Sequence, residues 1–144
     1  MFDYIVHTEI DITAPPERVW QALTDLAAYP DWNPMIRRAS GALEKGARLI
    51  VYFHPPGSRG RVFRPKLKVV EPNRELRWQG QPGFPFLLES EHVFIIQPTG
   101  NNKIHLIHDM IFYGLLVPFV KKIAKNSTHD PFVAMNRALK IRVE

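Results

Sequence analysis

The chain has 144 residues, a formal net charge of +5 and no cysteine, and 45% of its residues are apolar. This length fits one domain, residues 1–144, that removes roughly 70% of its unfolded surface from water, and the apolar content excludes a disordered protein. The lack of cysteine excludes disulfides and thiolate metal sites and suits the cytoplasm, so we predict a cytoplasmic protein.

No segment of the sequence predicts a membrane span or a signal peptide. The apolar stretch from Met110 to Val120 is interrupted by Gly114 and Pro118, and it is shorter than the roughly 20 residues that a membrane helix needs. The N-terminal residues alternate apolar and polar, without the positively charged start and apolar core of a signal peptide. We therefore expect no integral membrane segment.

The first part of the chain predicts one strand followed by two short helices. Residues 4–12 alternate between apolar and polar side chains, which is typical of a strand with one buried face. Pro15 and Pro16 suit the entry to a helix whose apolar stripe includes Leu23. Prolines within residues 30–34 restrict the residues before them, so the second helix is expected to be a short corner.

Short apolar or alternating segments, separated by turn residues, predict six further strands. They span Ile36–Ser40, Arg48–Phe53, Val62–Val70, Glu75–Gly80, Leu87–Gln97 and Lys103–Phe112. Every connection is short and rich in turn residues, so an antiparallel meander is the simplest topology. Pro65 lacks an N–H group for a neighbouring strand, and it therefore predicts an edge position or a bulge.

A long amphipathic helix is predicted from about Val117 to Arg142, with an interruption near Pro131, which cannot donate a helical hydrogen bond. Its apolar stripe comprises Val120, Ile123, Ala124, Met135, Ala138 and Leu139. One helix cannot cover the inner face of six or seven strands by flat packing. We therefore predict an α+β fold in which a curved antiparallel sheet wraps the terminal helix and leaves a space between them.

Several short motifs are spread over nearly the whole chain in this order of elements. They are Ile12-Thr13-Ala14-Pro15, Val19-Trp20, Leu23-Thr24-Asp25, Trp32-Asn33-Pro34, Leu76-Arg77-Trp78, His92-Val93-Phe94, His108, Phe112-Tyr113-Gly114-Leu115 and Met135-Asn136-Arg137-Ala138-Leu139-Lys140. With these residues the chain resembles the START-like superfamily, the helix-grip fold of the birch pollen allergen, and more narrowly its bacterial polyketide cyclase/dehydrase-like branch.

The resemblance implies an internal cavity, between the sheet and the C-terminal helix, that holds a hydrophobic or amphipathic small molecule. Some relatives are cyclases, dehydratases or hydrolases, and others are carriers or sensors. This branch often has a glutamate two residues after the histidine at the position of His108, where this chain has Met110. The departure removes a buried acid and counts against cyclase-type acid/base chemistry.

Strand alternation predicts which side chains line such a cavity, because residues two apart in a strand share a face. The two strands before the last helix each carry a mostly apolar face with one central histidine. Together with one residue of an earlier strand and one of the last helix, we expect these ligand-binding residues: Trp78, Ser90, His92, Phe94, Leu106, His108, Met110, Phe112 and Met135.

His92 and His108 are the candidates for chemistry, since neighbouring inward positions bring them within side-chain reach. They could be hydrogen-bonded structural residues, could orient a polar group of a ligand, or could act as an acid/base pair, because histidine titrates near neutrality. We predict no metal site, since a catalytic zinc needs three protein ligands and no third ligand has a persuasive spacing.

Two phenylalanines, Phe84 and Phe86, occupy a glycine- and proline-rich loop from Gly80 to Phe86. They could dock the loop on the core, or they could form the portal that a ligand passes. A basic group, Arg64, Lys66 and Lys68, predicts a solvated outer face of the sheet or a weak contact with an anionic surface. No aromatic stacking series accompanies it, so nucleic acid is not an expected partner.

The sequence favours a non-catalytic binding protein whose ligand is a polyketide-like aromatic, a fatty acid or an isoprenoid. The alternatives are a cyclase or dehydratase that uses His92 and His108, and a protein-interaction module with a closed cavity. No nucleophile elbow, phosphate loop or dinucleotide fingerprint is present, so we expect no catalytic triad and no cofactor.

Overall fold

The structure is a computed structural model that describes residues 3–80 and 87–144. Its helical elements are α1 (Pro16–Thr24), the 3₁₀ turn η1 (Leu26–Ala28), α2 (Tyr29–Trp32), α3 (Val117–Ala124), the π-helical turn η2 (Lys125–His129) and α4 (Asp130–Val143). Its strands are β1 (Asp3–Ile12), β2 (Ile36–Ser40), β3 (Ile50–Phe53), β4 (Arg61–Phe63), β5 (Lys66–Glu71), β6 (Glu75–Gly80), β7 (Glu89–Gly100) and β8 (Lys103–Tyr113).

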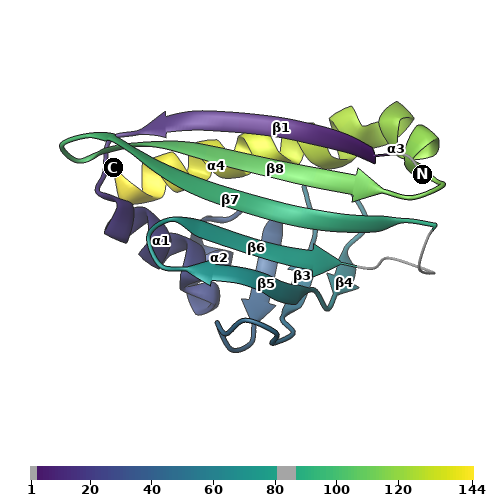
Figure 1. Cartoon of the computed structure of the whole chain (residues 1–144), viewed down its shortest axis with the longest axis horizontal. Helices are drawn as coiled ribbons and strands as arrows, with labels where there is room; N and C mark the ends of the chain where they lie inside the picture. The colour runs from purple at the N-terminus through teal and green to yellow at the C-terminus, as the bar shows by residue number, and fades with distance from the viewer. Residues whose placement is uncertain (1–2, 81–86) are drawn as a thin grey trace.

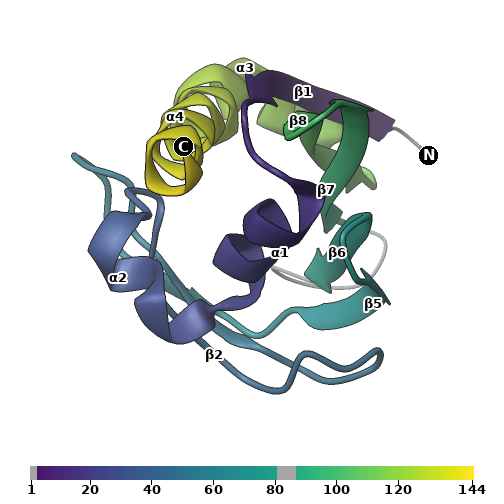
Figure 2. The ribbon, with the colours of Figure 1, turned by 90° about the vertical axis from the view of Figure 1, so that its left-hand side faces the viewer.

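The strands form two antiparallel sheets that bend around the C-terminal helix. The larger sheet has the order β1-β8-β7-β6-β5, and the smaller has the order β2-β3-β4. Figure 1 shows α4 running behind the long strands β1, β8 and β7. Seen from the end, in Figure 2, the strands form an arc from β1 near α4, through β7 and β6, to β5 and β2. The predicted helix-grip fold is therefore confirmed.

The structure differs from the sequence prediction in the number and grouping of strands. The segment Val62–Val70, expected as one strand, is divided into β4 and β5, so the described residues contain eight strands in two sheets rather than six or seven in one. Pro65 lies at the division, where its missing N–H group stops it from continuing either ladder. Beside this point, the segment just before β3 is linked to β5 by an isolated bridge between Arg48 and Lys66 and by three backbone hydrogen bonds between residues 46–49 and 65–67.

The expected interruption of the last helix takes the form of the π-helical turn η2, directly before α4. Pro131 occupies the first turn of α4, where its lack of an N–H group is tolerated most easily. Phe132 and Met135 follow it on the face that packs against the sheet, and both are fully buried. Ile123, expected on the buried stripe, is instead 60% exposed.

The core fills one part of the space between the sheet and α4. Figure 2 shows α1 inside the end of the arc, and its Val19 and Leu23 are fully buried there. Phe94 of β7 and Leu106 of β8 complete the packing from the sheet. Within the described residues, no helix is both long and apolar enough to cross a membrane.

Candidate ligand-binding cavity

A cavity of about 910 Å³ lies between the two sheets and the C-terminal helical segment. Its lining residues come from β2, β3, β4, β6, β7, β8, α3, η2 and α4, and from the loop between β3 and β4. Apolar side chains dominate the interior: Ile36, Val51, Phe53, Phe63, Trp78, Leu88, Met110, Phe112 and Val120. A cavity of this size and composition is typical of sites that bury most of the surface of a small organic molecule.

The cavity opens to solvent where the loop before β4 faces α3 and η2. The exposed residues Arg59, Arg61, Lys122 and Asn126 line this mouth, and Asp130 adds one negative charge. None of them was among the predicted ligand-binding residues, because the sequence does not show that the loop before β4 and the polar side of the last helical segment line one cavity. The basic loop directly after Pro55-Pro56-Gly57 was the signal that could have indicated them.

The structure divides the nine sequence-predicted ligand-binding residues into two groups. Trp78, Ser90, His92, Met110 and Phe112 line the cavity. Phe94, Leu106, His108 and Met135 lie in the packed core beside it and are at most 1% exposed. Phe94, Leu106 and His108 point to the same side of the sheet as the lining residues, but α1 and α4 cover this part of β7 and β8 directly. Met135 belongs to α4 itself. Phe84 and Phe86, the predicted portal, lie outside the described residues.

The three basic residues of the sequence prediction lie on the surface. Lys66 and Lys68 are exposed on β5, the edge strand of the larger sheet, and Arg64 is exposed just before it. Charged side chains at such an edge discourage pairing with another chain. A contact of these residues with an anionic surface stays a prediction.

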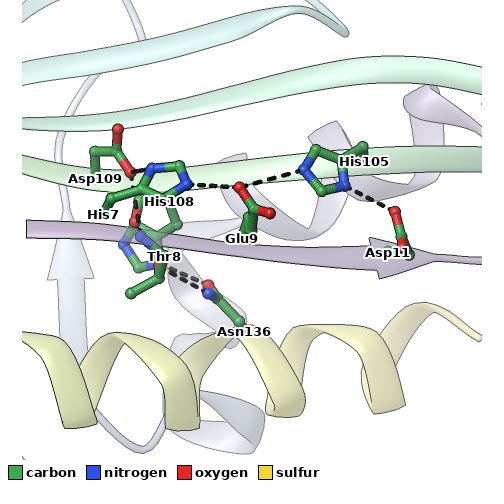
Figure 3. Close-up of polar contacts among 8 residues, drawn as sticks. All are labelled: His7, Thr8, Glu9, Asp11, His105, His108, Asp109 and Asn136. Atoms are coloured by element: carbon green, nitrogen blue, oxygen red, sulfur yellow. Dashed lines mark hydrogen bonds and ion pairs between the residues drawn. The ribbon is translucent and has the colours of Figure 1, made fainter.

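The two histidines are joined in a buried chain of hydrogen bonds that ends at the cavity. The Nε2 atoms of His92 and His108 are 2.6 Å apart, and Nδ1 of His108 lies 2.7 Å from Oδ1 of Asn136. Asn136 Nδ2 donates to the Thr8 hydroxyl over 2.9 Å, and this hydroxyl donates to the backbone carbonyl of His108. Figure 3 shows the part formed by His108, Asn136 and Thr8 between the strands and α4.

Aromatic rings hold both imidazoles in place. The centroid of the His108 ring lies 3.9 Å from that of Phe132 and 4.2 Å from that of Phe94, and the planes are tilted by only 10° and 22°. The His92 ring stacks on Phe132 at 4.8 Å, and Trp78 meets it edge-on at 4.9 Å. This packing fixes the positions of the ring nitrogens, as an orienting contact for a ligand requires.

Both imidazoles are neutral at neutral pH. Burial lowers the pKa of His108 to about 3, although its hydrogen bond with Asn136 opposes the shift. Burial also lowers the pKa of His92 well below its usual value, and the neighbouring His108 adds to the effect. Removing a cationic ring from water disfavours the charged form. The pair can therefore give and accept hydrogen bonds, but it is a weak base.

A second histidine network lies on the opposite, outer face of β1 and β8 (Figure 3). His7 Nδ1 is 2.7 Å from Asp109 Oδ1, and its Nε2 also contacts Glu9. His105 lies between Glu9 and Asp11 on the same face. These side chains point away from the cavity. Within the described residues, no group of three or more histidine, aspartate or glutamate side chains is arranged to hold a metal ion.

Comparison with known families gives a match over nearly the whole chain. Residues 4–144 match the model of a family described as polyketide cyclase / dehydrase and lipid transport. The chain belongs to this family. The resemblance to the START-like superfamily and to its polyketide cyclase/dehydrase-like branch is thereby confirmed, and this membership supports a ligand-binding pocket. Among curated proteins, no sequence match was found.

Solved structures of the same fold include enzymes and a START superfamily protein. Zhui aromatase/cyclase from Streptomyces sp. R1128 superposes with a TM-score of 0.79 at 14% identity, covering 99% of this chain and 94% of that one. Norcoclaurine synthase from Thalictrum flavum gives 0.75 at 18% identity, with coverages of 99% and 94%. A START superfamily protein from Mycobacterium smegmatis gives 0.74 at 25% identity, with 96% of each chain covered. The two enzymes are too distant in sequence to show more than the shared fold.

Proposed function

We propose that this protein binds a hydrophobic or amphipathic small molecule in the cavity between its sheets and its C-terminal helical segment. The observation that carries the proposal is the cavity itself: about 910 Å³, lined mainly by apolar side chains, with few polar groups inside. Most of its polar lining residues lie at the mouth, so a ligand can bury its carbon skeleton inside while a polar end remains near water.

Burial of apolar surface supplies the affinity. A ligand that buries ~200 Å² of carbon surface gains about 5 kcal/mol at ~25 cal/mol per Å², before the cost of association. The edge of Trp78 and the rings of Phe53 and Phe112 offer contacts to a flat or branched hydrocarbon. Polyketide-like aromatics, fatty acids and isoprenoids all meet this requirement.

The charges at the mouth favour an amphipathic ligand with an anionic or strongly polar outer end. Arg59, Arg61 and Lys122 line the opening, and Asp130 is the one acidic side chain among the lining residues. An anionic group held there would keep contact with water while the apolar part enters. Arginine is well suited to this role because its planar guanidinium binds carboxylates and phosphates through two hydrogen bonds.

The geometry favours binding over the alternative of a cyclase or dehydratase. His92 is the histidine of the pair that lines the cavity, and the low pKa of both rings makes them poor proton acceptors at neutral pH. A proton passed from His92 to His108 would meet the amide of Asn136, which cannot carry it further. The chain of hydrogen bonds therefore orients groups better than it relays protons.

Native mass spectrometry of protein purified without detergent tests the proposal. We expect a population that carries a retained small molecule, which is lost on denaturation and partitions into organic solvent. Protein without a retained molecule, together with no binding of any of a panel of apolar aromatics, fatty acids and isoprenoid alcohols, would contradict it.

A further inference from the structure

The buried chain of hydrogen bonds has a direction, and one fixed group at its far end sets that direction. The backbone carbonyl of His108 can only accept a hydrogen bond, so the Thr8 hydroxyl must donate its single hydrogen to it. The oxygen of Thr8 is then available only as an acceptor for the side chain of Asn136. This orients the amide with its NH₂ group toward Thr8 and its oxygen toward His108.

The orientation of the amide determines the protonated nitrogen of each imidazole. Because Oδ1 of Asn136 is an acceptor, Nδ1 of His108 carries the hydrogen, and Nε2 of the neutral ring has the lone pair. Nε2 of His92 lies 2.6 Å from Nε2 of His108, faces its lone pair, and must therefore carry a hydrogen of its own. In a neutral His92 ring, the remaining nitrogen, Nδ1, is then a hydrogen-bond acceptor.

Among the residues that the structure describes, none uses this last acceptor, which lies beside the cavity. His92 lines the cavity and is 5% exposed. Among the described residues, no group forms a hydrogen bond with its Nδ1. The described polar atoms that are both fully buried and without a partner are Trp32 Nε1 and Asn33 Nδ2, so Nδ1 of His92 is not fully buried. The lone pair of Nδ1 is therefore accessible to a molecule inside the cavity.

We propose that His92 Nδ1 accepts a hydrogen bond from a hydroxyl group at the inner end of the ligand, so that the cavity selects hydroxylated apolar molecules such as phenols or alcohols. This inference rests on the proposed binding function and adds the ligand class and its orientation. The Thr8–Asn136–His108 chain acts by holding His92 in the accepting tautomer. These three residues position the contact, and of the four only His92 touches the ligand.

The same arrangement disfavours a ligand whose carboxylate points inward. A carboxylate can only accept hydrogen bonds, so it would face the lone pair of His92 Nδ1 in a desolvated site. Neither ring carries a positive charge to compensate, since burial lowers the pKa of both histidines. A carboxylate would be placed better at the mouth, near Arg59 and Arg61.

Three probes of similar size separate the possibilities: 2-naphthol, which has a hydroxyl donor; 2-methoxynaphthalene, which has an acceptor only; and 2-naphthoate, which is anionic. Their affinities are measured by calorimetry on the full chain and on the variant His92→Phe. For the wild-type protein we expect 2-naphthol to bind about three- to tenfold more tightly than 2-methoxynaphthalene, as one hydrogen bond allows. The variant should retain the affinity for the ether and lose this preference.

A measurement on the wild-type protein keeps the test independent of the variant's folding. In ¹⁵N nuclear magnetic resonance spectra of the ligand-free protein, His92 Nε2 should give a protonated-type signal and Nδ1 an unprotonated-type signal. The Nδ1 signal should move on addition of 2-naphthol and stay in place with 2-methoxynaphthalene.

The outcomes distinguish this inference from the proposed function. Equal binding of the naphthol and its ether, binding of the naphthoate that depends on His92, or a protonated Nδ1 overturns the inference and leaves the apolar binding function intact. A preference for 2-naphthol that persists in a folded His92→Phe protein overturns it as well. If none of the three probes binds, both the inference and the proposed function for aromatic ligands fail.

Discussion

The Nε2 atoms of His92 and His108 lie 2.6 Å apart, close enough that one hydrogen must lie between them. Two protonated nitrogens could not share this distance, so the pair can remain in place only while at least one Nε2 is unprotonated. The rings of Phe94 and Phe132 stack on both sides of His108 and hold the pair together. The contact therefore links the protonation of the core to the stability of the fold.

We predict that the protein loses stability as the pH falls below about 6.5. The pKa of His108 is lowered to about 3 by burial, and the pKa of His92 is lowered for the same reason. Between pH 6.5 and pH 3 the unfolded chain binds more protons than the native protein, so the free energy of unfolding decreases as the pH falls. At about 1.4 kcal/mol per pH unit for each group, the loss from pH 7 to pH 4 is on the order of 3 kcal/mol for His108 alone, and His92 adds to it.

Urea denaturation at pH 7, 6, 5 and 4 measures this loss. The double variant His92→Phe/His108→Phe serves as the control, because it keeps two aromatic rings and removes both titrating groups. Its stability should fall less steeply with pH than that of the wild-type protein. Identical slopes for the two proteins would show that the pair does not titrate as described.

Removal of the Asn136 amide should destabilise the protein strongly. Asn136→Leu keeps a similar volume but leaves the Thr8 hydroxyl without a donor and His108 Nδ1 without an acceptor, both in the core. Unsatisfied buried polar groups cost ~1–3 kcal/mol each, so we expect a loss of about 2–4 kcal/mol in the free energy of unfolding. The neighbouring exposed position gives a matched control: Arg137→Leu should change it by less than about 0.5 kcal/mol.

His7 on the outer face and the buried pair His92 and His108 should titrate on opposite sides of the ordinary histidine pKa of 6.5. The hydrogen bond with Glu9 is the main cause that raises the pKa of His7, and Asp109 adds to it. His7 is exposed, so its stabilising contribution is small; it is present at low pH and lost as the pH rises through the raised pKa. In proton spectra recorded as a function of pH, His7 should titrate above 6.5, whereas His92 and His108 should remain neutral at pH 5.

Glu9→Gln provides the control for this titration, since it removes the charge and keeps the shape. The midpoint of His7 should move down in the variant, and the signals of the buried pair should not change. A midpoint of His7 that is insensitive to the substitution would be inconsistent with the network on the outer face.

The sequence identifies the inward face of the sheet but does not show how far along it the cavity extends. Alternation correctly puts His92 and His108 on one face, because the period of a strand is strict. The same pattern cannot distinguish Ser90, which lines the cavity, from Phe94, which α1 and α4 cover. That distinction depends on where helices distant in the sequence pack, and no local pattern contains this information.

The partners of the histidine pair are equally hard to predict, since they come from opposite ends of the chain. Thr8 and Asn136 are 128 residues apart, and they meet only because α4 packs across β1. Each is a polar residue on an otherwise apolar face, which is the signal that could have indicated a buried hydrogen bond. The division of the strand at Pro65 was easier to anticipate, because it follows from the chemistry of that one residue.

The central claim, that the cavity is the binding site, is tested most directly by filling it. Ser90→Trp places a large ring inside the cavity, and Thr99→Trp places the same ring on an exposed part of β7 as a control. In calorimetric titrations with 2-naphthol, we predict that Ser90→Trp weakens binding at least about tenfold, through loss of the apolar surface that the ligand buries. Thr99→Trp should bind like the wild-type protein. Equal affinity of all three proteins for 2-naphthol would place the ligand elsewhere and contradict the account.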